Sequence, residues 1–264
     1  MSLGEKLTNK LFKWVVLYPG FRKFVNWAYS DVMKMAQYHI GLAPGQVGKY
    51  ILLVDDPQDA ERVGAHFTDT QATARHREYH TFCGTLDGEK VCATSLGTGG
   101  PPAAIGLHEL AAIGADSFIY LGNGFAPAHP AKTADLIVVK GAVRDEGTGL
   151  QYAPLAFPAI ADLAVTECLI KACKENGAPF LTGLARSTDR YYQAAESSAK
   201  FPHILCSDTS TAAIFITASV LGKRAGALLQ AGEGMQPLTD AHIAAGVAAL
   251  RLLIAADGKA VIRR

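Results

Sequence analysis

The chain has 264 residues, a hydrophobic content of 49% and a formal net charge of +1. This length allows one large α/β domain or two small ones, and the low net charge argues against nucleic acid as a partner. The chain has five cysteines, which is an odd number, and no two of them form a CxxC motif. They predict buried thiols in a reducing, cytoplasmic compartment, not a disulfide framework or a zinc site.

Residues 1–37 differ in composition from the rest, with six lysines and arginines against two acidic residues. Apolar residues at helical spacing on both sides of Pro19-Gly20 predict two short amphipathic helices. This basic arm either packs on the domain or on a partner subunit, or lies on a membrane surface. Tryptophans and leucines on one face favour packing. The charges throughout the arm and its short apolar runs predict no signal peptide.

From residue 38 to residue 264, apolar strand-like runs alternate with amphipathic helical runs. This alternation predicts one domain with a mostly parallel or mixed sheet between helical layers. Charged or polar loops are predicted at 144–148 and 186–192. The predicted strands are 50–54, 76–86, 90–95, 117–121, 136–140 and 180–185. The predicted helices are 59–67, 103–113, 160–176, 212–221 and 239–253.

Two glycine-rich segments follow predicted strands, at 97–101 and at 122–124. Ligands of open α/β sheets bind at the carboxyl ends of strands. Glycine lets backbone N–H groups approach an anion or a sugar closely. The two segments are therefore either part of a ligand site or only tight connections.

Several short motifs follow one another in a set order along the domain. They are HIGL at 39–42, DP at 56–57, HREY at 76–79, SLGTGGP at 95–101, LG at 121–122, RDEG at 144–147, QYAPLAFPA at 151–159 and the last helix around His242. Together they resemble the nucleoside phosphorylase family, most closely its uridine phosphorylase branch. The resemblance implies a three-layer αβα domain with a mixed, barrel-like central sheet. It also implies a homodimer or a ring of dimers, and cleavage of a nucleoside by inorganic phosphate without a cofactor.

The expected phosphate site departs from the family pattern. The resemblance assigns Arg77 to it, supplied by the neighbouring subunit, and Arg62 if the alignment shifts by two residues. Asp55 stands where the family has glycine, Tyr120 where it has arginine and Asn123 where it has threonine. A carboxylate beside a phosphate dianion opposes binding by roughly several kcal/mol unless one of the two is protonated.

The sugar and base sites are only partly matched. The family's sugar-binding carboxylate falls on Thr209, with Asp208 one residue away, and these two are the expected catalytic residues. The uracil-reading Gln and Arg of the family fall on Ala195 and Ser197, so altered base specificity is expected. The expected ribose-binding residues are His39, from the neighbouring subunit, Thr98 and Asp208. The expected base-binding residues are Gly124, Tyr191 and Arg190.

Most of these residues also have a structural interpretation. His39 and Arg77 fit a dimer interface, Asp208 fits a helix cap and Tyr120 fits packing in the sheet. No His, Asp or Glu set has metal-ligand spacing, so no metal site is expected. Three functions stay open: a phosphorylase of altered specificity, a nucleosidase with Asp55 or Asp208 as its base, and a non-catalytic protein that binds a partner through the arm.

Overall fold

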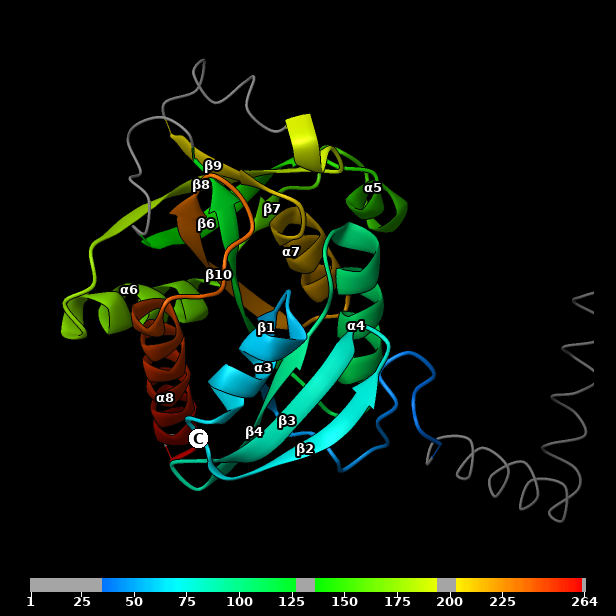
Figure 1. Ribbon diagram of the computed structural model, residues 1–264, viewed down its shortest axis with the longest axis vertical. Coiled ribbons are helices and arrows are strands. Elements are labelled where there is room, and N and C mark those ends of the chain that lie inside the picture. The colour runs from blue at the N-terminus through cyan, green and yellow to red at the C-terminus, as the bar shows by residue number, and fades with distance from the viewer. Residues whose placement is uncertain (1–34, 127–135, 194–202, 263–264) are drawn as a thin grey trace, which may run out of the picture. The chain divides into compact units, whose positions relative to one another are not determined.

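The computed structural model of the protein describes residues 35–126, 136–193 and 203–262 (Figure 1). The fold below is that of the unit that begins at Gln37. The amphipathic arm predicted at 1–37 lies almost entirely outside the described residues, as do Ala195 and Ser197. The arm, its membrane or partner contact and the boundary at residue 37 stay predictions.

Strands and helices alternate along the chain, as the sequence predicts. The strands are β1 (Tyr50–Val54), β2 (Thr68–His76), β3 (Tyr79–Leu86), β4 (Glu89–Ser95), β5 (Ser117–Phe125), β6 (Leu136–Asp145), β7 (Ala159–Ile160), β8 (Phe180–Thr188), β9 (Ile204–Asp208) and β10 (Arg224–Gly232). The helices are α3 (Pro57–Gly64), α4 (Gly100–Ala112), α5 (Thr148–Tyr152), α6 (Leu163–Glu175), α7 (Thr211–Val220) and α8 (Asp240–Ile262), with a 3-10 turn at Tyr191–Gln193.

The sheet has the order β10-β6-β8-β9-β5-β1-β4-β3-β2, and β10 also pairs with β5. Strands β10, β6, β8, β9 and β5 therefore close on one another into a five-strand, barrel-like ring. Strands β1, β4, β3 and β2 extend from it as an open wing, and the short β7 pairs with β6 (Figure 1). Pairing is mixed, parallel for β1 with β4 and β5 and antiparallel for β3 with β2 and β4. The predicted mixed, barrel-like sheet is confirmed.

Helices cover both faces of the sheet, and alternate residues of a strand point to different helical layers. In β1, Ile51 and Leu53 join a core with α4 and α7, whereas Leu52 and Val54 join a core with α3, α6 and α8. This period of two follows from the pleat of a strand, and burial on both faces explains why β1 is apolar throughout. The predicted three-layer αβα architecture is confirmed.

Helix α8 is long and apolar enough to cross a membrane, with a mean hydropathy of 1.4 over Asp240–Lys259. Half of that stretch is buried, however, and Ile243, Leu250 and Leu253 belong to the core that α8 shares with α6. An apolar helix that buries one face against other helices in this way is typical of a domain core.

Several predicted boundaries are wrong because packing overrides local composition. Strands β6 and β8 run to Asp145 and Thr188, so the predicted loops at 144–148 and 186–192 both begin inside strands. The second predicted glycine turn, 122–124, lies within β5, where Gly122, Asn123 and Gly124 pair with β10.

Strands β2 and β10 are absent from the prediction. β2 is a polar, mostly exposed edge strand, so it lacks a clear alternation of apolar and polar residues. β10 consists largely of small residues of low strand propensity, yet all but its first residue are buried. In both cases the pairing partner defines the strand.

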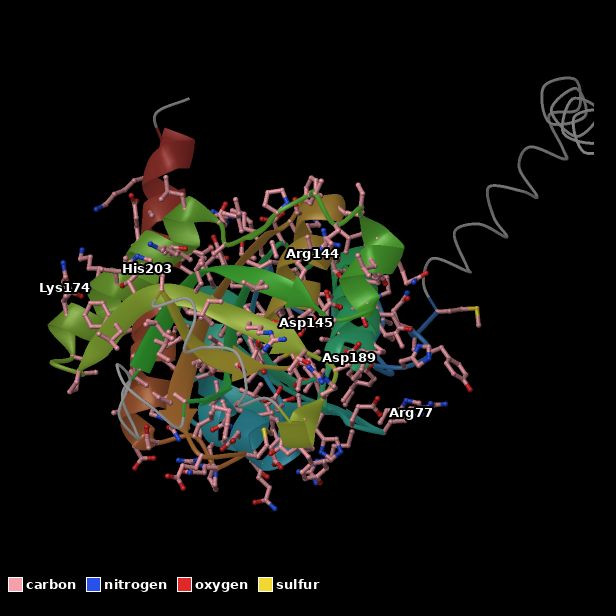
Figure 2. The ribbon with its side chains drawn as sticks, turned by 90° about the horizontal axis from the view of Figure 1, so that it is seen from above. Arg77, Arg144, Asp145, Lys174, Asp189 and His203 are labelled. Atoms are coloured by element: carbon pink, nitrogen blue, oxygen red, sulfur yellow. A yellow bond between two sulfur atoms is a disulfide. The ribbon has the colours of Figure 1, made fainter. Side chains whose placement is uncertain are left out.

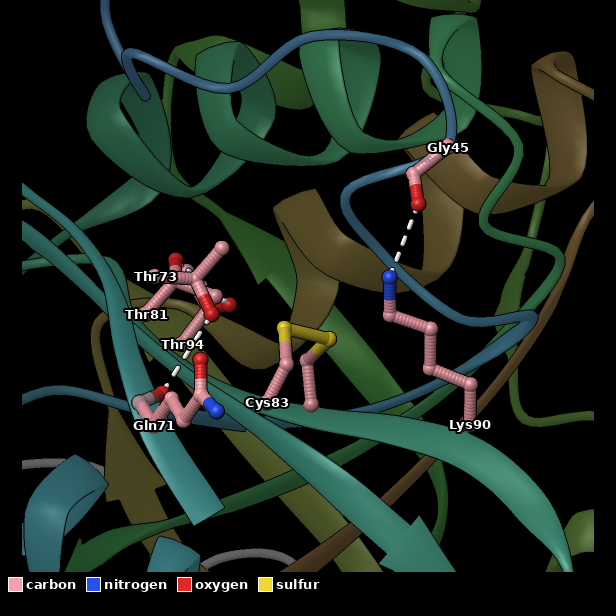
Figure 3. The surroundings of a disulfide bond; sticks show 8 residues. Gly45, Gln71, Thr73, Thr81, Cys83, Lys90 and Thr94 are labelled. Carbon is pink, nitrogen blue, oxygen red and sulfur yellow. Dashed lines mark hydrogen bonds between the residues drawn. A yellow bond between two sulfur atoms is a disulfide. The ribbon is translucent and has the colours of Figure 1, made fainter. Parts of the chain in front are cut away.

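The expectation that all five cysteines are free thiols is also wrong. Cys83 and Cys92 lie directly opposite each other on β3 and β4, with Cα atoms 4.1 Å apart, and form a disulfide (Figure 3). They are nine residues apart, and only the register of the hairpin reveals that they face each other. Disulfides persist in oxidising compartments. The cysteines therefore no longer support a cytoplasmic location, which stays a prediction.

Candidate functional site

A cavity of about 320 Å³ opens where β1, β5 and β9 end. It brings together five of the residues that the sequence singled out, and these are Asp55, Asn123, Tyr191, Asp208 and Thr209. They come from distant parts of the chain and meet because the antiparallel pair Phe125–Ser207 joins the ends of β5 and β9. A ligand of nucleoside size fits a cavity of this volume.

Tyr120 and Asp55, two of the three departures from the family's phosphate site, are bonded to each other. The Tyr120 hydroxyl donates a hydrogen bond of 2.7 Å to Asp55 Oδ1, and the Tyr120 side chain is buried. The Tyr120 side chain extends along β5 and lies over Gly122. A Cβ atom at residue 122 would overlap the tyrosine ring, so this position requires glycine. Tyr120 therefore combines the predicted packing in the sheet with a direct bond to the cavity wall.

The protonation of Asp55 depends on this environment. Burial raises the pKa of Asp55 to about 7, the hydrogen bond from Tyr120 opposes the rise, and the negative charges of Asp208, Asp59 and Asp56 add to it. Burial also raises the pKa of Tyr120 well above its ordinary value. At neutral pH the phenol therefore keeps its proton, and Asp55 divides between its neutral and charged forms.

Gly122→Ala is expected to destabilise the protein by about 1–3 kcal/mol, because the new methyl group displaces the Tyr120 ring and its bond to Asp55. Urea-induced unfolding measures the change. The control is Gly258→Ala in α8, where no atom lies within 4 Å of the added Cβ. That control should gain up to about 1 kcal/mol from helix propensity. If Gly122→Ala did not lower the free energy of unfolding, or changed it as Gly258→Ala does, the packing argument would be contradicted.

Asp208 is buried and caps helix α7. Its Oδ2 accepts hydrogen bonds from the backbone N–H groups of Ser210 (3.1 Å) and Thr211 (2.7 Å), and its Oδ1 accepts one from Ser187 Oγ (2.6 Å). Burial raises the pKa of Asp208 despite these bonds. The predicted capping role is thus present, and the carboxyl also lines the cavity.

Thr209 connects the cavity to the first glycine turn. Its Oγ1 lies 3.5 Å from Ser210 Oγ, which in turn accepts a hydrogen bond of 3.2 Å from the backbone N–H of Gly99. Gly97 and Gly99 have φ values of 74° and 102°, which favour glycine, so the predicted turn is confirmed. Thr98 between them is exposed and does not line the cavity.

The three expected base-binding residues have different surroundings. Tyr191 lines the cavity, and its hydroxyl accepts a hydrogen bond of 3.1 Å from the backbone N–H of Met235. Gly124 faces Cys206 in the sheet, because a Cβ atom there would lie 2.8 Å from the Cys206 sulfur. Arg190 is exposed, and its side chain does not line the cavity.

Arg62 is held away from an anion by other residues. Its guanidinium donates to Asp59 (2.8 Å), to Asp240 (2.8 Å) and to the carbonyl of Leu238 (2.6 Å). It borders a smaller cavity of about 200 Å³, which also contains Asp55 and Asn123. Because three of its five N–H donors are engaged and two acidic residues balance its charge, Arg62 is a poor candidate for the phosphate arginine.

His39 and Arg77 do not line the cavity of their own subunit. His39 Nδ1 lies 2.7 Å from Glu109 Oε1, which fixes the imidazole, and Arg77 lies over the Tyr38 ring at 5.3 Å. Arg77 points outward at the edge of the molecule (Figure 2). This placement agrees with both sequence interpretations, supply to a neighbouring subunit and an interface contact.

The Arg144–Glu146 segment has structural contacts. Arg144 is buried, and its guanidinium donates to the carbonyl oxygens of Ala153, Pro154 and Phe157. The carboxylate of the next residue, Asp145, forms an ion pair with Arg186. Arg144 and Asp145 are seen in Figure 2. Over the residues that the structure describes, no group of three or more His, Cys, Asp or Glu side chains could hold a metal ion.

Sequence reasoning missed part of the cavity wall. The residues that it did not identify are Phe125, Tyr192, Ser207, Glu233, Gly234 and Met235. Phe125 was hidden because β5 was predicted to end at residue 121, and Glu233 and Met235 because β10 was not predicted at all. An unbroken strand through Gly122 and Gly124 would have placed Phe125 at the cavity.

Comparison with known proteins identifies relatives of the chain. The model of the family described as "Phosphorylase superfamily" matches residues 49–256. A uridine phosphorylase of Treponema pallidum is 32% identical over 246 residues, which cover 84% of this chain and 95% of that protein.

Two further relatives match shorter segments. A uridine phosphorylase of Thermococcus kodakarensis is 42% identical over 170 residues, which cover 64% of this chain and 61% of that protein. A guanosine phosphorylase of Halorubrum lacusprofundi is 28% identical over 195 residues, which cover 73% of this chain and 81% of that protein. The named relatives thus differ in the base of their nucleoside.

Proposed function

Because the chain belongs to the phosphorylase superfamily, we propose that it cleaves the N-glycosidic bond of a nucleoside with inorganic phosphate, as a uridine phosphorylase-like enzyme of altered base specificity. The observation that carries the proposal is the cavity in which Asp55, Asn123, Asp208 and Thr209 meet at the strand ends. Inorganic phosphate is the co-substrate, and no cofactor is required.

The proposed chemistry assigns each end of the cavity a role. The sugar develops positive charge as the glycosidic bond lengthens, and the buried Asp208 carboxyl, with Thr209 beside it, faces that charge. Asn123 and Asp55 border the end where phosphate attacks. Tyr191 packs against the base. The cavity aligns the two reactants and thereby lowers the entropy cost of their encounter.

The comparisons favour this function over the two alternatives. The named relatives are phosphorylases, so neither the nucleosidase nor the non-catalytic binding protein is favoured. The Asp55–Tyr120 pair is then a variation within a phosphate site. An Asp55 carboxyl with a pKa of about 7 can bind beside an anion in its protonated form.

A homodimer, alone or within a ring of dimers, is part of the proposal. A groove of about 1050 Å³ runs beside β6 and β7, and its wall includes Leu155, Phe157 and Ile160. Leu155 is 64% exposed and Ile160 is 61% exposed, as is typical of a contact surface that is open in a single chain. In the proposed dimer, the neighbouring subunit supplies His39 and Arg77 to the cavity.

Incubation with a panel of nucleosides, with and without phosphate, tests the function. We expect free base and sugar phosphate only when phosphate is present, with a rate that saturates in phosphate. Release of base at the same rate without phosphate would show a nucleosidase instead. No release from any nucleoside, by a folded and oligomeric sample, would refute the proposed activity.

A further inference from the structure

Glu233 is a charged residue of the cavity wall to which the proposed chemistry gives no role. It follows β10, which ends at Gly232, and its side chain is exposed and lines the cavity. Among the described residues, no hydrogen bond or ion pair engages its carboxylate. A free carboxylate in a cavity wall accepts hydrogen bonds and donates none.

The other carboxyls of the cavity are already engaged. Asp208 accepts three hydrogen bonds from Ser187 and the start of α7, and Asp55 accepts one from Tyr120. No lysine, arginine or histidine is among the described residues that line the cavity. Glu233 is therefore the carboxylate of this cavity that has no partner among the described residues, and it offers only acceptors.

Aromatic side chains line the same cavity as this acceptor. Phe125, Tyr191 and Tyr192 line the cavity together with Met235, and the rings of Tyr191 and Tyr192 are 4.9 Å apart at 84°. A planar heterocycle can stack on such rings, and the Met235 sulfur favours aromatic contact. Glu233 and these rings therefore belong to the base-binding end of the cavity.

We propose that Glu233 reads the base, and that the site prefers nucleosides whose base carries an exocyclic amino group over those with a carbonyl at the same position. The inference rests on the proposed function. An amino group donates to the Glu233 carboxylate. A carbonyl oxygen presents lone pairs to it, so one acceptor faces another and both lose their bonds to water.

Two matched pairs of nucleosides test the preference. Cytidine and uridine differ in an amino group against a carbonyl on one ring position, and so do adenosine and inosine. Calorimetric titration without phosphate gives a Kd for each. We expect the amino member of each pair to bind at least about 10-fold tighter, the effect of one hydrogen bond to a charged group.

Glu233→Gln should reduce the preference to about 1-fold to 3-fold, because a glutamine amide both donates and accepts. The control is Glu89→Gln, an exposed glutamate on β4 that lines none of the described cavities, and it should keep the wild-type ratio.

Equal binding of the two members by wild-type protein, or the same ratio in Glu233→Gln, would overturn the inference. If cytidine and uridine are cleaved with phosphate but show no preference, the proposed function stands and the role of Glu233 fails. If no nucleoside binds at all, both fail.

Discussion

The KM for phosphate of the wild-type protein is expected to rise above about pH 7, and Asp55→Asn is expected to abolish this rise. The pKa of Asp55 is raised to about 7, so the carboxyl is neutral below that pH and negative above it. Two unit charges about 5 Å apart at an effective dielectric constant of 20 repel by about 3 kcal/mol, which corresponds to roughly 100-fold in affinity. Steady-state kinetics from pH 6 to pH 8.5 measures the effect. Phosphate ionisation affects both proteins alike.

Tyr120→Phe is the matched control, because it removes a hydrogen bond and leaves the Asp55 charge in place. The Tyr120 hydrogen bond lowers the pKa of Asp55, so its loss should move the rise in KM to a higher pH. A rise of equal size in wild-type protein and in Asp55→Asn would place Asp55 outside the phosphate site.

The stability of the protein provides a readout that does not depend on turnover. The pKa of Asp55 rises from an unfolded value of 3.8 to about 7 in the fold, so the folded state holds the proton more tightly. Its contribution to stability is complete below pH 3.8 and is lost as the pH rises through 7. Asp55→Asn should therefore increase the free energy of unfolding at pH 8 by up to about 4 kcal/mol relative to wild type, and by about 2 kcal/mol or less at pH 5.

Arg77→Ala is expected to raise the KM for phosphate by about 100-fold or more, because a guanidinium makes strong, charge-assisted bonds to phosphate. In the proposed dimer this arginine serves the neighbouring cavity, so the loss should be reversible by mixing subunits. Asp208→Asn supplies the complementary defect, because it removes the cavity charge and keeps one side-chain oxygen for the cap of α7.

At phosphate concentrations well below the raised KM, where both variants are impaired, equal amounts of the two should regain about a quarter of wild-type activity after dissociation and reassociation. Half of the dimers are then mixed, and one cavity of each mixed dimer has both Arg77 and Asp208 intact. If Arg77 serves its own subunit, every cavity in the mixture keeps one defect. Activity that stays at the level of the separate variants would therefore contradict supply from the neighbour.

The sequence predicts the layers of the fold because burial leaves a periodic signal. The apolar strand 50–54 and the glycine that follows helix α4 are examples, and Gly114 has the positive φ expected of a helix end. The disulfide and strand β10 were missed for one physical reason. Both depend on which residues become neighbours across the sheet, and spacing along the chain does not contain that information.

The site was predictable as a set of unusual residues, and its internal bonds were not. Asp55 and Tyr120 stood out separately as departures from the family pattern. Their bond follows from the register of β1 and β5, in which Val54 pairs with Leu121 and so places Asp55 beside Gly122. The side chain of Tyr120 fills the space over that glycine. Glu233 left no signal, since a single exposed glutamate after a small-residue segment resembles any surface loop.

The absence of a side chain at Gly122 also affects which substitutions the site can accept. The space above this glycine holds the ring of Tyr120, because residue 122 has no side chain. An arginine at position 120, the residue that the family resemblance expects there, would use the same space. In the proposed phosphate site, exchanges at positions 55 and 120 therefore change the local charge, provided that residue 122 stays glycine.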